Sequence, residues 1–150
     1  MAAITQIGLT VPDIDKAVDW YSKVLDFKVI VAPYDTIEKK QLTDLSRDLY
    51  GAPFRRARLA QLNDPNKIGI ELFEFEQTPS PADANSRPGL FHLCVTSQDQ
   101  QALADKIVRN GGKRRNISGL HSLIYCEDPF GNVIEVYPEQ TNSAIFEQSQ

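Results

Sequence analysis

Two glutamates stand inside segments that otherwise look like buried β-strands. Glu71 lies in GIELFEF, residues 69–75, and Glu135 lies in NVIEVY, residues 132–137. Both segments are rich in β-branched and aromatic residues, which is typical of strands. Burying an ionised carboxylate without a partner costs several kcal/mol, so packing alone does not account for either residue. Each glutamate therefore needs an explanation other than packing.

The elements that must position these glutamates follow one order twice. Each half of the chain is predicted to form a strand, an amphipathic helix and three further strands, at about residues 4–76 and 90–138. The proline-containing linker at 77–89 separates the halves, and residues 139–150 form a polar tail. The sequence therefore predicts an α+β fold made of paired βαβββ modules within a single domain, residues 1–150.

The repeat also aligns residue by residue. When QIGLTVPD is set over HLCVTSQD, the helix-capping residues Asp13 and Asp99 coincide, and Gln6 falls on His92. At the far end of each half Glu71 falls on Glu135. Equivalent strands of two related modules face a shared centre, so we expect these side chains to converge. The four converging residues are Gln6, Glu71, His92 and Glu135.

An amide oxygen, an imidazole and two carboxylates suit a hard or borderline divalent cation. A bound cation would also remove the cost of placing two like charges side by side. The sequence therefore predicts one divalent metal ion, whether Zn, Ni, Co, Mn or Fe. The alternative for each residue alone remains open: a strand histidine can be an ordinary core or surface residue, and a strand glutamate can point to solvent.

Side chains two positions along the same strands are predicted to lie beside the metal ligands, because strand residues alternate between faces. They are predicted to line a substrate pocket, although plain core packing is the alternative. These residues are Thr10, Phe73, Phe75 and Tyr137. His121 is a further candidate, as a ligand in place of Gln6 or as an acid, unless it lies on the surface.

The net charge and the amino-acid composition exclude some classes of function. The net charge of −4 and the pI near 5.1 argue against nucleic acid as a partner. No apolar run approaches the length of a membrane span, so we expect a cytoplasmic protein that binds no membrane. Cys94 and Cys126 both lie in strand patterns and are expected to be buried, reduced thiols rather than a disulfide or a nucleophile.

Four segments together resemble the vicinal oxygen chelate superfamily, which includes glyoxalase I, bleomycin resistance proteins, extradiol dioxygenases and several epimerases. The segments are IGLTVPDIDKAVDWYSKVLDF, GIELFEF, FHLCV and EDPFGNVIEVY. The resemblance implies a curved, half-open mixed sheet around one metal ion, with ligands at Gln6, Glu71, His92 and Glu135. This ligand pattern is similar to that of one class of glyoxalase I. The stretch DLYGAPFRRARLAQL is more similar to a branch that includes cyclitol epimerases.

The resemblance implies a metal-dependent isomerase, epimerase or lyase that moves a proton next to a carbonyl of a small metabolite chelated through vicinal oxygens. Glu135 would be the general base, with Glu71 as ligand and second acid or base. Thr10 and Phe75 stand where glutathione-dependent enzymes carry arginine and asparagine, so glutathione is not expected. The alternatives are a metal-free protein that binds an antibiotic or another small molecule, and a dioxygenase. A homodimer is implied, with the modules pairing within one chain or across two.

Overall fold

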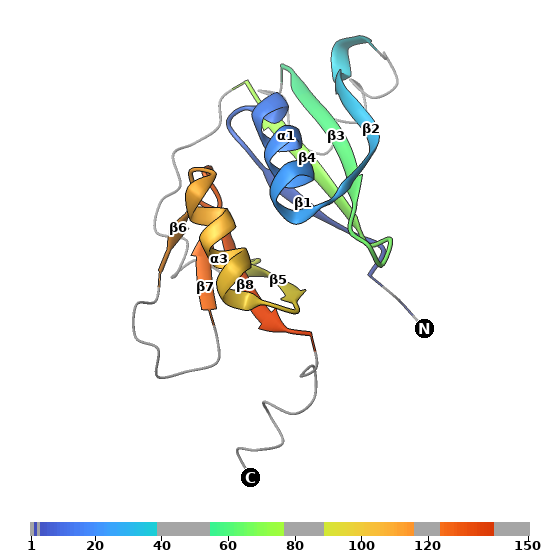
Figure 1. Cartoon of the computed structure of the whole chain (residues 1–150). Helices are drawn as coiled ribbons and strands as arrows, with labels where there is room; N and C mark the ends of the chain where they lie inside the picture. Colours follow the sequence, from blue (N-terminus) through green and yellow to red (C-terminus); the bar gives the residue numbers. More distant parts are fainter. Residues whose placement is uncertain (1, 3, 39–54, 77–88, 116–123, 140–150) are drawn as a thin grey trace. The chain divides into compact units, whose positions relative to one another are not determined.

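The computed structural model describes residues 2, 4–38, 55–76, 89–115 and 124–139, which fall into two compact units (Figure 1). The first unit is Met1–Ser80 and the second is Pro81–Gln150. The division lies inside the predicted linker, of which residues 77–88 are outside the described residues. Each unit contains one four-stranded sheet and one longer helix, and the two are built in the same way.

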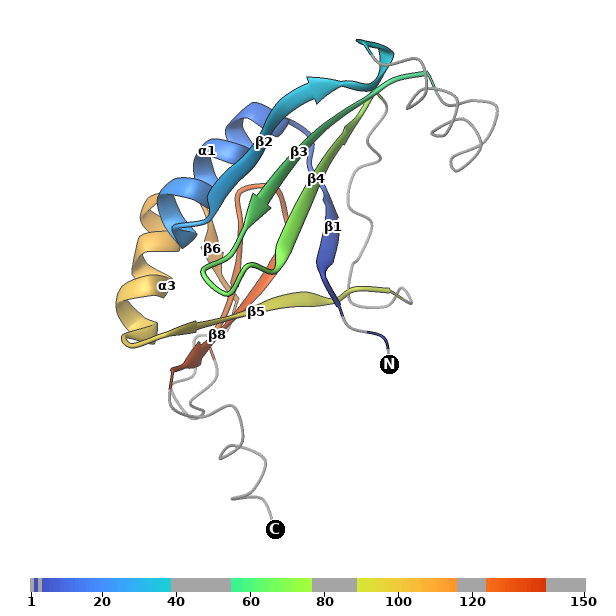
Figure 2. The same cartoon turned by 90° about the vertical axis from the view of Figure 1, so that its right-hand side faces the viewer.

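The first unit begins with a strand and a helix and continues with three strands. Its elements are β1 (Gln6–Thr10), α1 (Ile14–Leu25), β2 (Lys28–Asp35), the 3-10 turn η1 (Thr36–Glu38), β3 (Ala57–Asn63) and β4 (Gly69–Phe75). The strand order is β1-β4-β3-β2, with β1 parallel to β4 and the other pairs antiparallel. Figure 2 shows this order across the sheet, with α1 against one face.

The second unit repeats this plan. Its elements are β5 (His92–Ser97), α3 (Gln100–Arg109), β6 (Lys113–Arg114), β7 (Ile124–Glu127) and β8 (Val133–Pro138). The strand order is β5-β8-β7-β6, and β5 runs parallel to β8 just as β1 runs parallel to β4. Helix α3 packs against these strands. The expected α+β fold of paired βαβββ modules is therefore confirmed, as two mixed four-stranded sheets with two helices.

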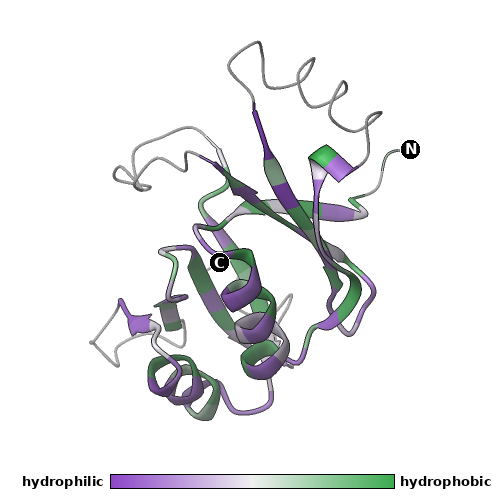
Figure 3. Cartoon of the chain, turned by 90° about the horizontal axis from the view of Figure 1, so that it is seen from above, coloured by the Kyte–Doolittle hydropathy of each residue, from purple (hydrophilic) through white to green (hydrophobic). Residues whose placement is uncertain are grey.

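Both helices begin at the aspartates that the sequence indicates. The Asp13 carboxylate accepts a hydrogen bond from the Lys16 backbone N–H at 3.1 Å, and Asp99 accepts from the Ala102 N–H at 2.8 Å. Each bond satisfies a donor that the first turn of a helix leaves without an intrahelical partner. Both helices carry hydrophobic residues along one side and polar residues along the other (Figure 3).

The turn after α3 depends on glycine for two reasons. Gly111 has a φ of +89°, a conformation that residues with a side chain rarely adopt. At Gly112 a Cβ atom would lie 2.4 Å from the Glu127 carbonyl oxygen and 2.5 Å from a methyl group of Ile107. The pair therefore lets β6 start directly against both β7 and the end of α3.

Alternation along the strands gives each sheet a face toward its helix and a face away from it. The helix-side residues form the core of each unit and include Leu9, Leu62, Leu72, Leu93, Cys126, Ile134 and Val136, all less than a tenth exposed. The opposite face, which we call the site face, carries Gln6, Gly8 and Thr10 in the first unit. In the second unit it carries His92, Cys94 and Thr96.

A glutamate on the helix side of β4 joins that strand to α1. The Glu74 carboxylate accepts a hydrogen bond from the Ile14 backbone N–H at 2.7 Å. Arg58 of β3 lies 3.6 Å from the same carboxylate and 2.7 Å from Asp15 of α1. A carboxylate at a helix N-terminus also interacts favourably with the helix dipole. The start of α1 is therefore fixed to the two central strands of its sheet.

One expectation about the cysteines is wrong. Cys126 is buried and both thiols are free, but Cys94 is exposed. The apolar neighbours Leu93 and Val95 suggested a strand buried on both faces, whereas alternation turns Cys94 onto the site face beside His92 and Thr96. Among the described residues, no helix is long and apolar enough to cross a membrane.

Candidate functional site

In the first unit the site face brings Gln6 and Glu71 together. Strands β1 and β4 are parallel with Gly8 opposite Glu71, so Gln6 lies one pleat away from the carboxylate. The Gln6 Nε2 donates to Glu71 Oε2 at 3.2 Å. Gln61, opposite Glu71 on β3, donates its own Nε2 to Gln6 Oε1 at 3.2 Å. A chain of hydrogen bonds therefore runs from Gln61 through Gln6 to Glu71.

Glu71 is half-buried, and desolvation raises the pKa of its carboxyl group. Desolvation, followed by the nearby Glu71 charge, also raises the pKa of the Tyr34 hydroxyl. Phe73 and Phe75 stack with parallel rings 5.9 Å apart on the same side of β4. The Phe73 ring comes within 3.2 Å of where a Cβ of Gly8 would be, so glycine lets the ring approach β1 closely.

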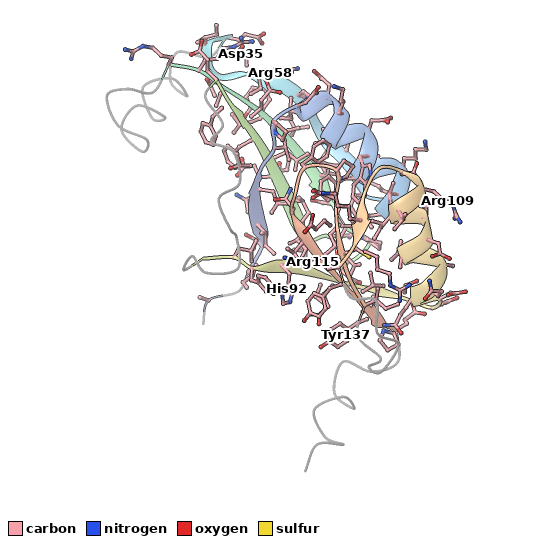
Figure 4. All side chains as sticks on the ribbon, turned by 90° about the vertical axis from the view of Figure 1, so that its left-hand side faces the viewer. Asp35, Arg58, His92, Arg109, Arg115 and Tyr137 are labelled. Atoms are coloured by element: carbon pink, nitrogen blue, oxygen red, sulfur yellow. The ribbon has the colours of Figure 1, made fainter. Side chains whose placement is uncertain are left out.

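In the second unit the equivalent positions bring His92 and Glu135 together. His92 lies one pleat before Cys94, and Cys94 is opposite Glu135 in the parallel pair of β5 and β8. The His92 Nε2 and Glu135 Oε2 atoms are 3.0 Å apart. Figure 4 shows the His92 and Tyr137 side chains on the strands of this unit. The repeat inferred from the sequence is thus reproduced in the strand register.

Glu135 is 4% exposed, and further side chains contact its carboxylate. Tyr125 lies opposite Glu135 on β7, and its hydroxyl hydrogen-bonds to the Glu135 carboxylate. This hydrogen bond raises the pKa of Tyr125 to about 12, with smaller contributions from desolvation and from the carboxylate charge. Desolvation of the Cys94 thiol, then the charge of Glu135 and a hydrogen bond to it, raise the pKa of Cys94 to about 11. The buried carboxylate is therefore compensated by polar neighbours, as buried charge requires.

The imidazole of His92 forms a cluster with two aromatic rings, whose own centroids are 6.5 Å apart. Phe91 and Tyr125 each meet it edge-on, at centroid distances of 5.2 and 5.7 Å. The Nδ1 atom is buried and has no hydrogen-bond partner among the described residues. Buried polar atoms nearly always have a partner, so this nitrogen is an exception that needs an explanation.

The donor set fits a divalent metal ion. The His92 Nε2 and Glu135 Oε2 atoms are 3.0 Å apart, which is a hydrogen-bond distance. Imidazole and carboxylate groups are both common ligands of divalent metal ions. The Gln6 Oε1 accepts from Gln61 and, having two lone pairs, can also face a cation. Among the described residues, no three His, Cys, Asp or Glu side chains gather as a ligand set.

The predicted pocket residues differ in exposure. Thr10 is exposed, Phe73 and Phe75 are half-buried, and Tyr137 is buried. All four lie on the site face of their unit, as alternation predicts. His121 is outside the described residues. Sequence reasoning missed Gln61 and Tyr125, which contact the predicted ligands; the signal available was that each precedes its glutamate by the same number of residues.

Solved structures with the same fold include three of particular interest. A glyoxalase family protein from Bacillus cereus has a TM-score of 0.70 at 16% identity, over 92% of this chain and 94% of that one. The trypanothione-dependent glyoxalase I of Leishmania major has a TM-score of 0.68 at 17% identity, over 99% of this chain and 93% of that one. A fosfomycin resistance protein of Mesorhizobium loti has a TM-score of 0.63 at 12% identity, over 100% of this chain and 99% of that one. At these identities the likeness concerns the fold alone.

No curated protein sequence matches the chain closely enough to count as a relative. The family model of the Glyoxalase/Bleomycin resistance protein/Dioxygenase superfamily, in contrast, matches residues 3–136. That match spans both units, including both pairs of predicted ligands. Together with the paired βαβββ fold, it shows that the chain belongs to the Glyoxalase/Bleomycin resistance protein/Dioxygenase superfamily.

Proposed function

We propose that this protein is a divalent-metal-dependent isomerase, epimerase or lyase that moves a proton next to a carbonyl of a small metabolite with vicinal oxygens. One observation carries the proposal: Gln6 with Glu71 and His92 with Glu135 occupy the same register positions of two equivalent sheets. Two such pairs supply four ligands that suit one ion. The two pairs would join within one chain or across a homodimer.

The polar contacts of each pair support the proposal. In the second unit two groups that commonly bind metal ions, the buried Glu135 carboxylate and the His92 imidazole, lie 3.0 Å apart on the sheet face away from the helix. The desolvated carboxyl group of Glu71, whose pKa burial raises, is a further sign of a functional site. Carboxyl groups with a raised pKa gather at functional sites more often than elsewhere.

When bound, a divalent cation supplies positive charge that stabilises negative charge developing on the substrate oxygens. The protein residues would hold the substrate and move the proton. Glu135 is the proposed general base and Glu71 the second acid or base, so an epimerisation would use one on each side of the substrate carbon. Phe73 and Phe75 would cover the apolar part of the substrate and reduce the access of water.

Metal content is the first test of this proposal. We expect the purified protein to contain, or to take up from nickel, zinc, manganese, cobalt or ferrous iron solutions, one ion for each set of four ligands. Glu135→Gln is expected to lose this uptake, while Glu76→Gln, an exposed glutamate just beyond β4, is the matched control. A wild-type protein that binds none of these ions would overturn the proposal and favour a metal-free binding protein.

The reaction class is tested by proton exchange. In deuterated water the metal-loaded protein is expected to remove the α-proton signal of a 2-hydroxy ketone, and Glu135→Gln is expected to abolish that exchange. Oxygen consumption with a catechol, without such exchange, would instead identify a dioxygenase. His92→Gln compared with His121→Gln decides which histidine binds the ion, because only the ligand substitution should lower metal uptake.

A further inference from the structure

Gln61 and Tyr125 occupy the same place in the two units. Gln61 is opposite Glu71 in the antiparallel pair of β3 and β4, and Tyr125 is opposite Glu135 in the antiparallel pair of β7 and β8. Residues directly opposite one another on one face of such a pair have neighbouring side chains. Each therefore lies beside a glutamate of the proposed metal site without being one of its ligands.

Gln61 and Tyr125 make different contacts, but each contacts a predicted metal ligand of its own unit. The Gln61 amide donates to Gln6 Oε1, whose own amide donates to Glu71, so a single side chain orients two others. The Tyr125 hydroxyl hydrogen-bonds to the Glu135 carboxylate, while the Tyr125 ring meets the His92 imidazole edge-on at 84°. Tyr125 therefore contacts both members of its pair, one through the hydroxyl and one through the ring.

We propose that Gln61 and Tyr125 are positioning residues that hold the two ligand pairs in the orientation that binds the metal ion. This inference rests on the proposed metal-dependent function and extends it to residues outside the ligand set. Ligands held by outer hydrogen bonds need no reordering when the ion binds, and the loss of such a partner typically weakens metal affinity roughly 10- to 100-fold.

Tyr125→Phe isolates the hydroxyl, because the phenyl ring can keep the edge-on contact with His92. Gln61→Leu removes the amide at similar size. For each variant, cobalt(II) affinity is measured by competition with a chelator of known affinity, together with the visible absorption spectrum of the bound cobalt. We expect roughly 10- to 100-fold weaker binding and an altered spectrum, since the spectrum depends on ligand geometry. A loss of fold stability alone would not alter the spectrum of the cobalt that remains bound.

Gln98→Leu is the matched control, because Gln98 is exposed and lies between β5 and α3, outside both sheets. It should bind cobalt with the affinity and spectrum of the wild type. If Tyr125→Phe and Gln61→Leu also behave like the wild type, the positioning role is overturned while the metal site stands. If the wild type itself binds no cobalt or other tested ion, the proposed function fails first and the positioning role fails with it.

Discussion

The two ligand pairs share one position in the repeat but differ in their surroundings. Glu135 is 4% exposed, and among the described residues it is contacted by His92, Tyr125 and Cys94. Glu71 is half-buried, and the described residues give it a hydrogen bond from Gln6. The same strand register therefore supports one carboxylate that is tightly held and one that is less constrained.

The difference teaches that equivalent positions need not have equal roles. A carboxylate held by several donors is already oriented, so it gives up little conformational freedom when it binds an ion. A carboxylate with fewer contacts can change its orientation at a lower cost. On this view His92 and Glu135 anchor the proposed ion, and Gln6 and Glu71 adapt to it.

The largest expected effect compares the two glutamates directly. Residues that hydrogen-bond to a metal ligand contribute at most roughly 100-fold to metal affinity. We expect Glu135→Gln to weaken cobalt(II) binding by more than this, and Glu71→Gln to weaken cobalt(II) binding by less than Glu135→Gln does. The reason is that the preoriented ligand contributes more of the binding free energy. Competition titration of both variants measures the ratio, and a greater loss for Glu71→Gln would contradict the anchoring role of the second unit.

The cysteine beside Glu135 offers a second test, because Gly8 takes the equivalent place in the first unit. A pKa raised to about 11 keeps the Cys94 thiol protonated at neutral pH. Its alkylation by iodoacetamide is therefore expected to be roughly 10- to 100-fold slower than that of an ordinary exposed thiol, and to accelerate as the pH rises toward that value. Mass spectrometry of the alkylated peptides gives the rates.

Glu135→Gln tests the cause of this low reactivity. The substitution removes the carboxylate charge and changes the hydrogen bond, both of which contribute to the raised pKa of Cys94. Cys94 should then react faster at pH 8, while buried Cys126 should stay unreactive in the folded protein. An unchanged alkylation rate at Cys94 would show that the Glu135 carboxylate does not raise the pKa of the thiol.

The helix caps compare the units away from the site. Asp13→Ala and Asp99→Ala are each expected to lower the free energy of unfolding by about 1 kcal/mol, because each removes an acceptor for an N–H in the first helical turn. Asp19→Ala, at an exposed position inside α1, should change it by much less. Urea denaturation measures all three. A clearly smaller effect at one cap would show that the two units do not depend equally on their helices.

The smallest expected effect is the acid dependence of the first cap. Hydrogen bonds from the Lys16 side chain and backbone lower the pKa of Asp13 in the folded protein. Its contribution to stability is therefore present above the unfolded pKa of about 4 and is lost as the pH falls through the lower folded value. The difference in stability between wild type and Asp13→Ala should shrink over that range, as followed by thermal unfolding.

Much of the architecture could be predicted because it depends on local pattern. Asp13 and Asp99 mark the helix starts through the chemistry of their own side chains, and alternation places Glu71 and Glu135 on a known strand face. The pairing of Gln6 with Glu71 and of His92 with Glu135 followed from the repeat. In these cases the residues near in sequence, or their repeat equivalents, carried enough information.

The roles of Gln61 and Tyr125 could not be predicted in the same way, because they depend on which residue lies opposite which across antiparallel strands. That register is set jointly by the hydrophobic patterns of both strands and by the geometry of the turn between them, so neither strand alone fixes it. The exposure of Cys94 was missed for a related reason: an apolar run does not say which of its faces lies against the helix.

The glutamates of β4 show how that register is protected. Glu71 and Glu74 are three residues apart and so point to opposite faces, and the bond from Ile14 N–H to Glu74 exists in only one alignment of strand and helix. A slip of one residue would turn Glu71 toward the core and carry Glu74 to the other face. Glu74 therefore stabilises the observed alignment of β4 with α1. The placement of Glu71 on the site face thus depends on a residue that takes no part in the proposed chemistry.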